Sequence, residues 1–372
     1  MKQTDSRDLA TAAPGGVRAG RAAVFTGVGR PLELQTMPVP EPKTGEILVR
    51  VLGCTVCGSD VHTCLGRRTT PLPAILGHEI LGRIEAFGTA APRRDARGRP
   101  LNAGDRVTWS LVASCGACFY CRRGLPQKCT QAFKYGHQAL QAELGPRGGL
   151  ADYCLLAPGT AVVRPDETLS DEAACPANCG TATMIAAAEA AGDVRDRCVV
   201  VLGAGLLGLT GCALARSRGA AEVILADTQA SRLARGEMFG ATRIVAADQL
   251  AADVKSATSG YGADVIIDTA GVPEAFEAGF PLLRLGGTFV LVGAVFPARA
   301  VDLHVERIVR RNLRLCGIHN YLPEQLVRAL EFLERREFPW DTLVSEWLPL
   351  AEAQRAFQRA QDPAVVRVGV RP

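Results

Sequence analysis

Short stretches of alternating apolar and polar residues dominate the first third of the chain. Glycine and proline separate them and interrupt regular structure. The pattern occurs at 22–28, 32–40, 46–57, 82–88 and 105–112. Such alternation is typical of antiparallel strands, so we predict a compact, barrel-like β domain. The segment 92–100, which carries four arginines, is predicted to be a surface loop.

A different pattern begins near residue 182, where continuous apolar runs alternate with helical periodicity. The alanine-rich segment 182–191 predicts a helix that leads into a second domain. Apolar strands are predicted within 199–208, 221–227, 264–271, 286–295 and 313–320. Strands that alternate with helices indicate a doubly wound parallel sheet, and therefore an α/β protein. Two helical patterns, near 324–334 and 350–359, lead to the strand-like end at 365–372.

Length and composition are those of an ordinary globular chain. The 372 residues suggest about two domains. Hydrophobic residues make up 48% and charged residues 22%, which are typical values. The net charge is only +4, and no block of five or more basic residues occurs. We therefore expect neither a nucleic-acid partner nor a membrane surface.

The first twenty residues are small and polar, with no apolar core between their charges. We predict a disordered arm over 1–20 and no secretory signal. No run approaches the ~18 apolar residues that a membrane helix requires. Thirteen cysteines in a chain without such a signal indicate metal ligands and a reducing compartment, so we expect a cytoplasmic protein.

Four cysteines lie close together in the segment 115–129. Cys115, Cys118, Cys121 and Cys129 have the spacing Cys-x2-Cys-x2-Cys-x7-Cys. Four thiolates from one tight loop can converge on a tetrahedral zinc ion and leave no position open for substrate. An iron–sulfur cluster is the competing interpretation, because it also accepts four closely spaced cysteines.

A glycine-rich turn follows the apolar strand at 199–202. It reads Gly203-x-Gly205-x-x-Gly208, and Leu206 and Leu207 open the helical stretch. Alone, the glycines could form an ordinary β–α turn. The next strand ends in Asp227, however, and strand, glycines, helix and acidic residue together indicate a dinucleotide site with the pyrophosphate at the helix N-terminus.

The acidic residue also indicates which dinucleotide binds. The Asp227 carboxylate should bond the ribose hydroxyls and repel a 2′-phosphate, which favours NAD over NADP. Arg232 lies five residues further on and could soften that repulsion.

Three further residues have the chemistry of a catalytic metal site. Cys57 and His78 bracket the segment CGSDVHTCLGRRTTPLPAILGH, and Cys179 is the best candidate for a third ligand. Two thiolates and an imidazole suit zinc and leave one position open. Each residue alone could equally be a buried core residue.

The segment 57–79 resembles the zinc-dependent alcohol dehydrogenases of the medium-chain dehydrogenase/reductase superfamily. The resemblance rests on Cys-Gly-Ser-Asp-x-x-His, Thr-Pro-Leu-Pro and Gly-His-Glu, and it spans about residues 22–370. It implies a GroES-like catalytic domain over 21–182 and 320–372 and a Rossmann domain over 183–319. It also implies catalytic zinc at Cys57, His78 and Cys179, structural zinc in the 115–129 lobe, and hydride transfer between an alcohol and NAD.

The resemblance extends to the residues around the catalytic zinc. Asp60 is expected to bond the distal nitrogen of His78. Glu79 is expected either to approach the metal or to form a structural salt bridge. Ser59 and His62 occupy the positions of the family's proton relay.

Resemblance also places the rest of the cofactor. Thr183, Val292 and Ala294 are expected at the nicotinamide end, and Arg367 at the pyrophosphate. It further implies a homo-oligomer, either a dimer or a tetramer.

Five residues are candidates for the substrate pocket: Arg67, Arg68, Lys134, His137 and His319. Asn320 and Tyr321, which follow His319 in the segment GIHNY, are expected to face the same cleft. Basic groups recognise carboxylate or phosphate oxygens, so an anionic alcohol is favoured, although the arginines could simply be solvated. The segments 108–129, 133–137 and 317–321 resemble a branch associated with phosphonate metabolism. The alternatives are a neutral polyol or amino-alcohol dehydrogenase and an NAD-binding scaffold without turnover.

Overall fold

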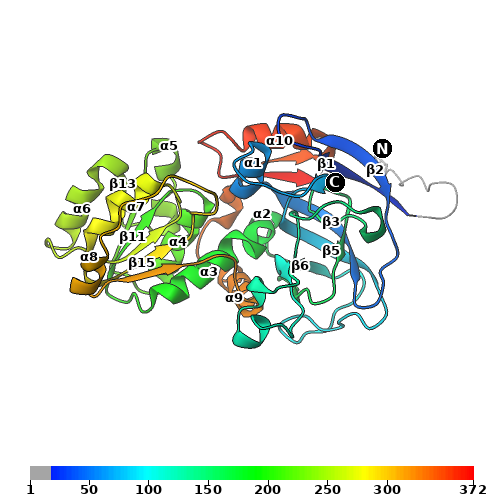
Figure 1. Cartoon of the computed structure of the whole chain (residues 1–372), viewed down its shortest axis with the longest axis horizontal. Helices are drawn as coiled ribbons and strands as arrows, with labels where there is room; N and C mark the ends of the chain where they lie inside the picture. Colours follow the sequence, from blue (N-terminus) through cyan, green and yellow to red (C-terminus); the bar gives the residue numbers. More distant parts are fainter. Residues whose placement is uncertain (1–17) are drawn as a thin grey trace, which may run out of the picture.

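The structure, a computed structural model, describes residues 18–372, which form two lobes (Figure 1). The lobe on the right is mainly β-structure, and the lobe on the left is a sheet flanked by helices. The arm predicted over 1–20 lies largely outside the described residues. Its last two residues, Ala19 and Gly20, belong to a strand, against the prediction, because they pair with Pro38 and Met37.

Three sheets build the β-rich lobe. The largest has the order β10-β6-β5-β3-β18-β17, with β9 also paired to β3; the others are β2-β1-β4 and β7-β8. The strands are β1 (Ala19–Phe25), β2 (Glu33–Pro38), β3 (Ile47–Thr55), β4 (Ala74–Ile75), β5 (Glu79–Phe87), β6 (Arg106–Trp109), β7 (Val112–Ala113), β8 (Phe133–Lys134), β9 (Tyr153–Leu156), β10 (Val162–Val163), β17 (Val344–Pro349) and β18 (Arg367–Arg371). In β3, Val49 and Val51 are buried while Arg50 is exposed, which is the alternation expected of a half-buried strand.

The second lobe is a parallel sheet with the order β13-β12-β11-β14-β15-β16. Its strands are β11 (Cys198–Leu202), β12 (Glu222–Asp227), β13 (Arg243–Ala246), β14 (Ala263–Asp268), β15 (Leu283–Leu291) and β16 (Arg314–Gly317). Val199 and Val201 face one apolar core, whereas Val200 and Leu202 face another. Both faces are therefore covered, as a doubly wound sheet requires.

Helices cover these two faces. They are α4 (Leu206–Ser217), α5 (Ala230–Leu233), α6 (Leu250–Ala257), α7 (Pro273–Gly279) and α8 (Val305–Arg310). The other α-helices in the part of the chain that the structure describes are α1 (Gly58–Cys64), α2 (Asp171–Ala174), α3 (Gly180–Ala191), α9 (Pro323–Glu334) and α10 (Ala353–Arg359). Among the described residues, no helix combines the length and apolar character needed to cross a bilayer.

The end of the chain returns to the β-rich lobe, where β18 pairs with β3 in antiparallel fashion, Gly369 opposite Thr55. In Figure 1 the red C-terminal segment lies beside the blue N-terminal strands. One apolar core joins the two lobes: Leu111 from the β-rich lobe, Met184 of α3, Leu206 of α4 and Leu330 of α9 belong to the same cluster. The helix α3 is therefore the element through which the lobes are packed together.

The segment 92–100 is a loop, as predicted, but it is held in place. Asp95 is buried and accepts hydrogen bonds from the backbone and side chain of Arg99. Arg97 reaches Glu334 at the end of α9, 3.0 Å away. The loop therefore ties the β-rich lobe to α9.

Candidate active site

The fold brings Cys57, His78 and Cys179 together. Cys57 precedes α1, His78 precedes β5, and Cys179 precedes α3, so each residue lies where an ordered element begins. One donor atom from each lies within 4.8 Å of the others. All three line a cavity of about 570 Å³. Two sulfur donors and an imidazole suit zinc, and the cavity leaves a side of the site open to substrate.

Asp60 fixes the orientation of His78. Its Oδ1 atom lies 3.1 Å from His78 Nδ1, and the same carboxylate accepts from the backbone N–H groups of Cys57 and Gly77. This bond leaves Nε2 of His78 free to act as the metal donor. Burial by itself lowers the pKa of His78. The neighbouring Asp60 and Cys57 outweigh this effect and raise the pKa to about 10.

A buried ion pair lies behind the cysteine ligands. Arg367 of β18 donates to Glu79 through Nε at 2.9 Å and Nη2 at 3.1 Å, and Thr55 Oγ1 donates to the same carboxylate at 2.6 Å. Burial raises the pKa of Glu79 to about 7 although Arg367 opposes the shift. Of the two roles expected for Glu79, the structure has the salt bridge.

The thiol chemistry of Cys57 suits a metal ligand. Its hydrogen bond with Cys179 lowers the pKa of the Cys57 thiol well below its usual range; burial opposes this, and His78 and Arg367 reinforce it. Arg367 Nη2 lies 3.9 Å from the Cys57 sulfur. A thiolate is the form that binds metal, so these neighbours prepare Cys57 for that role.

The predicted relay residues flank the same site. Ser59 Oγ lies 3.4 Å from His78 Nε2. His62 packs against Phe296 with ring centroids 4.3 Å apart, and its Nδ1 is buried without a hydrogen-bond partner among the described residues. Burial and nearby Arg67 lower the pKa of His62. Both relay residues line the cavity, but their function in proton transfer stays a prediction.

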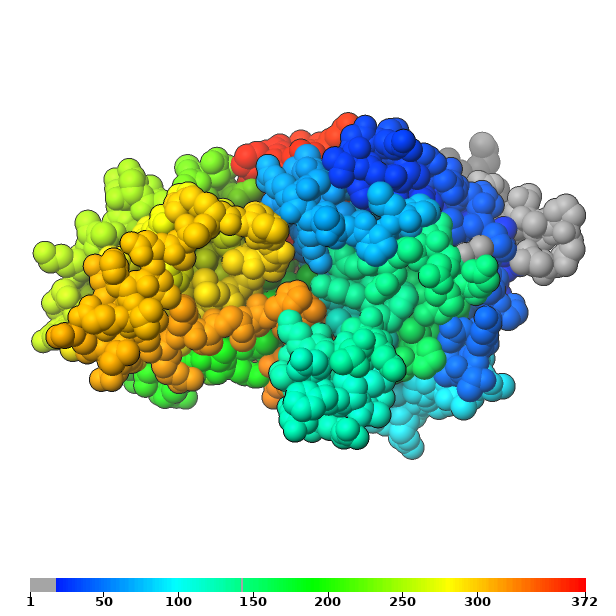
Figure 2. Space-filling model, in the orientation of Figure 1, coloured from blue at the N-terminus to red at the C-terminus, as the bar shows by residue number. Residues whose placement is uncertain are grey.

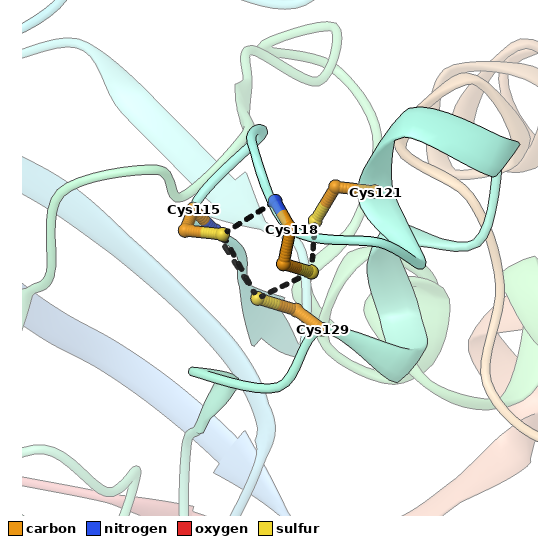
Figure 3. A group of neighbouring side chains, drawn as sticks. All are labelled: Cys115, Cys118, Cys121 and Cys129. Carbon is orange, nitrogen blue, oxygen red and sulfur yellow. Dashed lines mark hydrogen bonds between the residues drawn. The ribbon is translucent and has the colours of Figure 1, made fainter.

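Four sulfur atoms converge in the cysteine lobe (residues 115–129), as Figure 3 shows. The sulfur of Cys118 lies 3.5 Å from that of Cys121 and 3.9 Å from that of Cys129, which is 3.5 Å from the sulfur of Cys115. A tetrahedral ion with Zn–S bonds of about 2.3 Å places its sulfur ligands about 3.8 Å apart. The spacing therefore fits one zinc ion, since the iron–sulfur cluster considered above would spread its ligands further.

The glycines adopt the geometry of a dinucleotide turn. Gly203 has φ +97°, and a Cβ atom at Gly208 would lie 1.7 Å from the Gly203 carbonyl oxygen. Gly203, Gly205, Leu206 and Leu207 line the cavity, whereas Gly208 serves the close packing of strand and helix.

The cofactor candidates divide into those at the cavity and those elsewhere. Thr183, Val292 and Asp227 line it, and Asp227 is held by the N–H groups of Ala204 and Gln229 at 2.6 and 2.8 Å. Ala294 is exposed and does not line the cavity, although its neighbours Gly293 and Val295 do, because its side chain faces solvent.

Two arginines predicted at the cofactor are engaged by protein groups. Arg232 lines the cavity, but its Nε donates to the Pro363 carbonyl at 2.9 Å. Arg367 also lines the cavity, and its guanidinium is occupied by Glu79 and by the Val366 carbonyl. Contacts of these arginines with the cofactor stay predictions.

The substrate candidates fall into two groups. Arg68, Lys134, His137 and His319 line the cavity, but Arg67 is exposed outside it. Burial, reinforced by Arg68, lowers the pKa of Lys134 to about 8.

One sequence expectation at this end is wrong, and two residues here were not predicted. Tyr321, expected in the same cleft, is buried in the core, where its hydroxyl accepts from Leu111 N–H at 3.0 Å and donates to the Asn178 carbonyl. Lys128 and Phe296 were not among the candidates, yet Lys128 Nζ lies 2.6 Å from His319 Nδ1 and Phe296 lines the cavity. Neither has a sequence signal beyond the proximity of Lys128 to Cys129.

Family models match both lobes. A zinc-binding dehydrogenase model matches residues 207–335, and an alcohol dehydrogenase GroES-like domain model matches residues 43–166. The first match lies in the lobe with the parallel sheet, and the second in the β-rich lobe that carries Cys57, His78 and the cysteine lobe. The α/β fold class predicted from the sequence is thereby confirmed.

Known relatives cover nearly the whole chain. A probable alcohol dehydrogenase of Mycobacterium tuberculosis is 33% identical over 87% of this chain and 90% of its own. A D-arabitol-phosphate dehydrogenase of Enterococcus avium is 29% identical over 89% and 91%. The crystal structure of an alcohol dehydrogenase from Thermotoga maritima matches with a TM-score of 0.89 at 30% identity, covering 95% of this chain and all of that one. This chain belongs to the zinc-dependent alcohol dehydrogenases of the medium-chain dehydrogenase/reductase superfamily, and it is an NAD-dependent oxidoreductase.

Proposed function

We propose that this enzyme transfers hydride between NAD and a small hydroxyl compound that carries an oxyanion, of the phosphonate or phosphate type. The observation that carries the proposal is the charge at the substrate end of the cavity. Arg68 and Lys134 line the wall next to Cys57, His78 and Cys179. Among the described residues, neither cation forms a salt bridge with a carboxylate.

Cations held together without a counter-ion repel one another, and an anionic ligand relieves that repulsion. The neighbours that shift the pKa of Lys134 are Arg68, Lys128 and the cysteine sulfurs, and no carboxylate is among them. The acidic residues of the cavity wall belong to the cofactor lobe: Asp227 ends β12, and Glu274 lies in the first turn of α7. Apart from the metal ligands, the charged side chains at the substrate end of the cavity are therefore positive.

The surrounding residues have distinct tasks in such a reaction. When bound, zinc supplies Lewis acidity that lowers the pKa of a substrate hydroxyl, and NAD accepts the hydride. Ser59 lies next to the imidazole of His78 and can receive the hydroxyl proton. His62 can pass that proton outward. Phe296, packed on the His62 ring, excludes water from this path.

One relative supports the anionic substrate by its name, D-arabitol-phosphate dehydrogenase, since that compound joins hydroxyl groups to a phosphate. A neutral polyol or amino-alcohol substrate is the alternative, and it would leave Arg68 and Lys134 without a task. A scaffold without turnover would not need to keep Cys57, His78 and Cys179 within 4.8 Å of one another.

Substrate preference tests the proposal directly. We expect Arg68→Ala to raise KM for a hydroxyalkylphosphonate by about 10- to 100-fold, because a hydrogen bond to a charged group contributes about 1.5–3 kcal/mol. KM for a neutral alcohol of matched length should barely change. Arg67→Ala is the matched control, because it removes the same charge from the neighbouring position outside the cavity. Equal effects of Arg68→Ala on both substrates would contradict the proposal.

We also propose that two copies of the chain pair through the edge of the parallel sheet. Strand β16 lies at one edge of the parallel sheet and has one described partner, β15. Its residue Leu315 is 36% exposed. Val305 and Val309 of α8, the helix before it, are 65% and 70% exposed. An unpaired edge strand beside exposed apolar residues is a ready site for strand pairing.

This assembly can be tested by sedimentation. The double variant Val309→Glu/Leu315→Lys should lower the measured mass from that of an oligomer to that of one chain, because charge would be buried at the interface. Val28→Glu changes an equally exposed valine on the β-rich lobe, 60% exposed, and should leave the mass unaltered. An unchanged mass for the double variant would exclude this interface.

A reducing compartment is part of the proposal. All thirteen cysteines are free. Thiols in that state suit the cytoplasm, where disulfides are rare.

A further inference from the structure

The single lysine of the cysteine lobe, Lys128, contacts the other lobe of the protein. Lys128 is the last residue of η2 (Pro126–Lys128) and directly precedes Cys129. The turn is closed by bonds from Lys128 N–H to the Leu125 carbonyl at 2.9 Å and from Cys129 N–H to the Pro126 carbonyl at 3.0 Å. In Figure 2 this blue-green lobe lies against the orange segment that follows residue 310. The position of Lys128 is thus set by the fold of the lobe.

The partner of Lys128 belongs to the wall of the substrate cavity. Lys128 Nζ lies 2.6 Å from Nδ1 of His319. His319 follows β16 in the opposite lobe, where Ile318 N–H bonds the Leu291 carbonyl at 2.8 Å, and it lines the cavity together with Arg68 and Lys134. This contact therefore spans the two lobes at the substrate end of the cavity.

Donor chemistry then determines the tautomer of His319. A lysine ammonium group has three donors and no acceptor, so Nδ1 of His319 must accept. The ring proton of a neutral imidazole is then on Nε2, which becomes a donor. Two cations, Arg68 and Lys134, flank a histidine that is held as an N–H donor.

We propose that Lys128 is a specificity-determining residue: it fixes His319 as an N–H donor to the oxyanion of the substrate, so that the cysteine lobe contributes to substrate recognition as well as to stability. This inference rests on the proposed function, since it concerns the oxyanion of the same substrate. Lys128 acts through His319 and is therefore a positioning residue for the anionic group. The hydroxyl end of the substrate, at Cys57, His78 and Cys179, is outside its reach.

Steady-state kinetics of the zinc-loaded enzyme tests the inference. Lys128→Met should raise KM for a hydroxyalkylphosphonate by about 10-fold, with kcat and the KM of a matched neutral alcohol within about twofold of wild type. Lys128→Arg keeps a donor and should restore most of the affinity. Arg122→Met is the matched control, because it removes one exposed charge from the same lobe without touching His319.

A double-mutant cycle separates the bond from a general charge effect. His319→Phe should reproduce the KM effect of Lys128→Met, and the double variant should be no worse than either single variant. The dissociation constant of methylphosphonate, measured by calorimetry on the NAD-bound enzyme, should rise in parallel. Zinc content must stay at two ions per chain in each variant, which shows that the cysteine lobe remains folded.

The outcomes distinguish this inference from the proposed function. If Arg68→Ala impairs the phosphonate reaction but Lys128→Met leaves KM and methylphosphonate binding unchanged, the inference is overturned and the proposed function stands. Impairment of neutral and anionic substrates alike by Lys128→Met also overturns it. If the wild-type enzyme shows no preference for the anionic substrate, both the proposed function and the inference about Lys128 are overturned.

Discussion

Replacing Cys179 with alanine is expected to reduce the zinc content from two ions per chain to one and to abolish alcohol-dependent NADH formation. Among residues 18–372, the catalytic site has three protein donors within 4.8 Å of one another, and Cys179 supplies one of them. Removing a partner that merely orients a metal ligand costs about 10- to 100-fold in affinity or activity. Loss of a ligand itself should therefore lower kcat/KM by more than about 100-fold.

Cys175 provides the matched control for this experiment. It lies in the same segment as Cys179 and is fully buried. It belongs neither to the group of four cysteines in the cysteine lobe nor to the group of three residues at the catalytic site. Cys175→Ala should keep two zinc ions per chain and most of the activity. Metal analysis measures the zinc content of both variants, and NADH absorbance measures their activity. Two ions per chain in Cys179→Ala, with activity preserved, would contradict the assignment of the site.

The metal clusters could be predicted from the sequence because their chemistry is local or carried by a motif. The four cysteines of the lobe lie within one short loop, so spacing alone brings their sulfurs together. Cys57 and His78 lie in one motif, but Cys179 is about a hundred residues away and was placed by the family resemblance. The glycine turn was predictable for a similar reason: strand, turn and helix are consecutive, and Gly208 must lack a Cβ atom to pack on Gly203.

Contacts between distant segments were beyond the sequence. Tyr321 is in a polar segment, GIHNY, that suggests a cleft, yet the packing of α9 on α3 turns its ring into the core. From the sequence, Lys128 would be interpreted as a solvated lysine. Its contact with His319 arises only when the two lobes pack together. The contact of the Arg367 guanidinium with Glu79, which follows from the pairing of β18 with β3, was not indicated either, and the expected contact of Arg367 with the pyrophosphate stays a prediction.

The same two lobes meet at α3, and this explains why the site lies there. Cys179 is directly N-terminal to α3, and Thr183 on the first turn lines the cofactor side of the cavity. One helix thus places a candidate metal ligand and a predicted cofactor contact at a fixed separation. Its apolar packing against α4 and α9 keeps that separation rigid, which hydride transfer requires.

The second large effect is expected from the buried ion pair between the first and last parts of the chain. Arg367→Met should lower the free energy of unfolding by about 3–5 kcal/mol, because it leaves a buried carboxylate without its partner. The Glu79 side chain is fully buried and that of Arg367 is 10% exposed, so water cannot replace the lost contact. Urea denaturation of the zinc-loaded protein measures the change, with metal analysis to show that both ions remain bound.

The pH dependence of this loss has a definite sign. The pKa of Glu79 is already raised to about 7 by burial, and removing Arg367 raises it further. A carboxyl group whose pKa in the folded state exceeds its unfolded value of about 4.3 destabilises the folded protein increasingly as pH rises towards the folded pKa. The difference in the free energy of unfolding between wild type and Arg367→Met should therefore grow between pH 6 and pH 8.

Arg371 on the same strand is the matched control for the loss of a β18 arginine. It pairs with Asp171 at 3.3 Å, but its side chain is 47% exposed. Exposed ion pairs contribute about 0–1 kcal/mol, so Arg371→Met should shift stability by no more than that. Glu79→Gln/Arg367→Met should recover part of the loss, because no uncompensated charge is left inside the protein. Equal destabilisation by Arg367→Met and Arg371→Met would show that the buried pair does not fasten the end of the chain to the metal site.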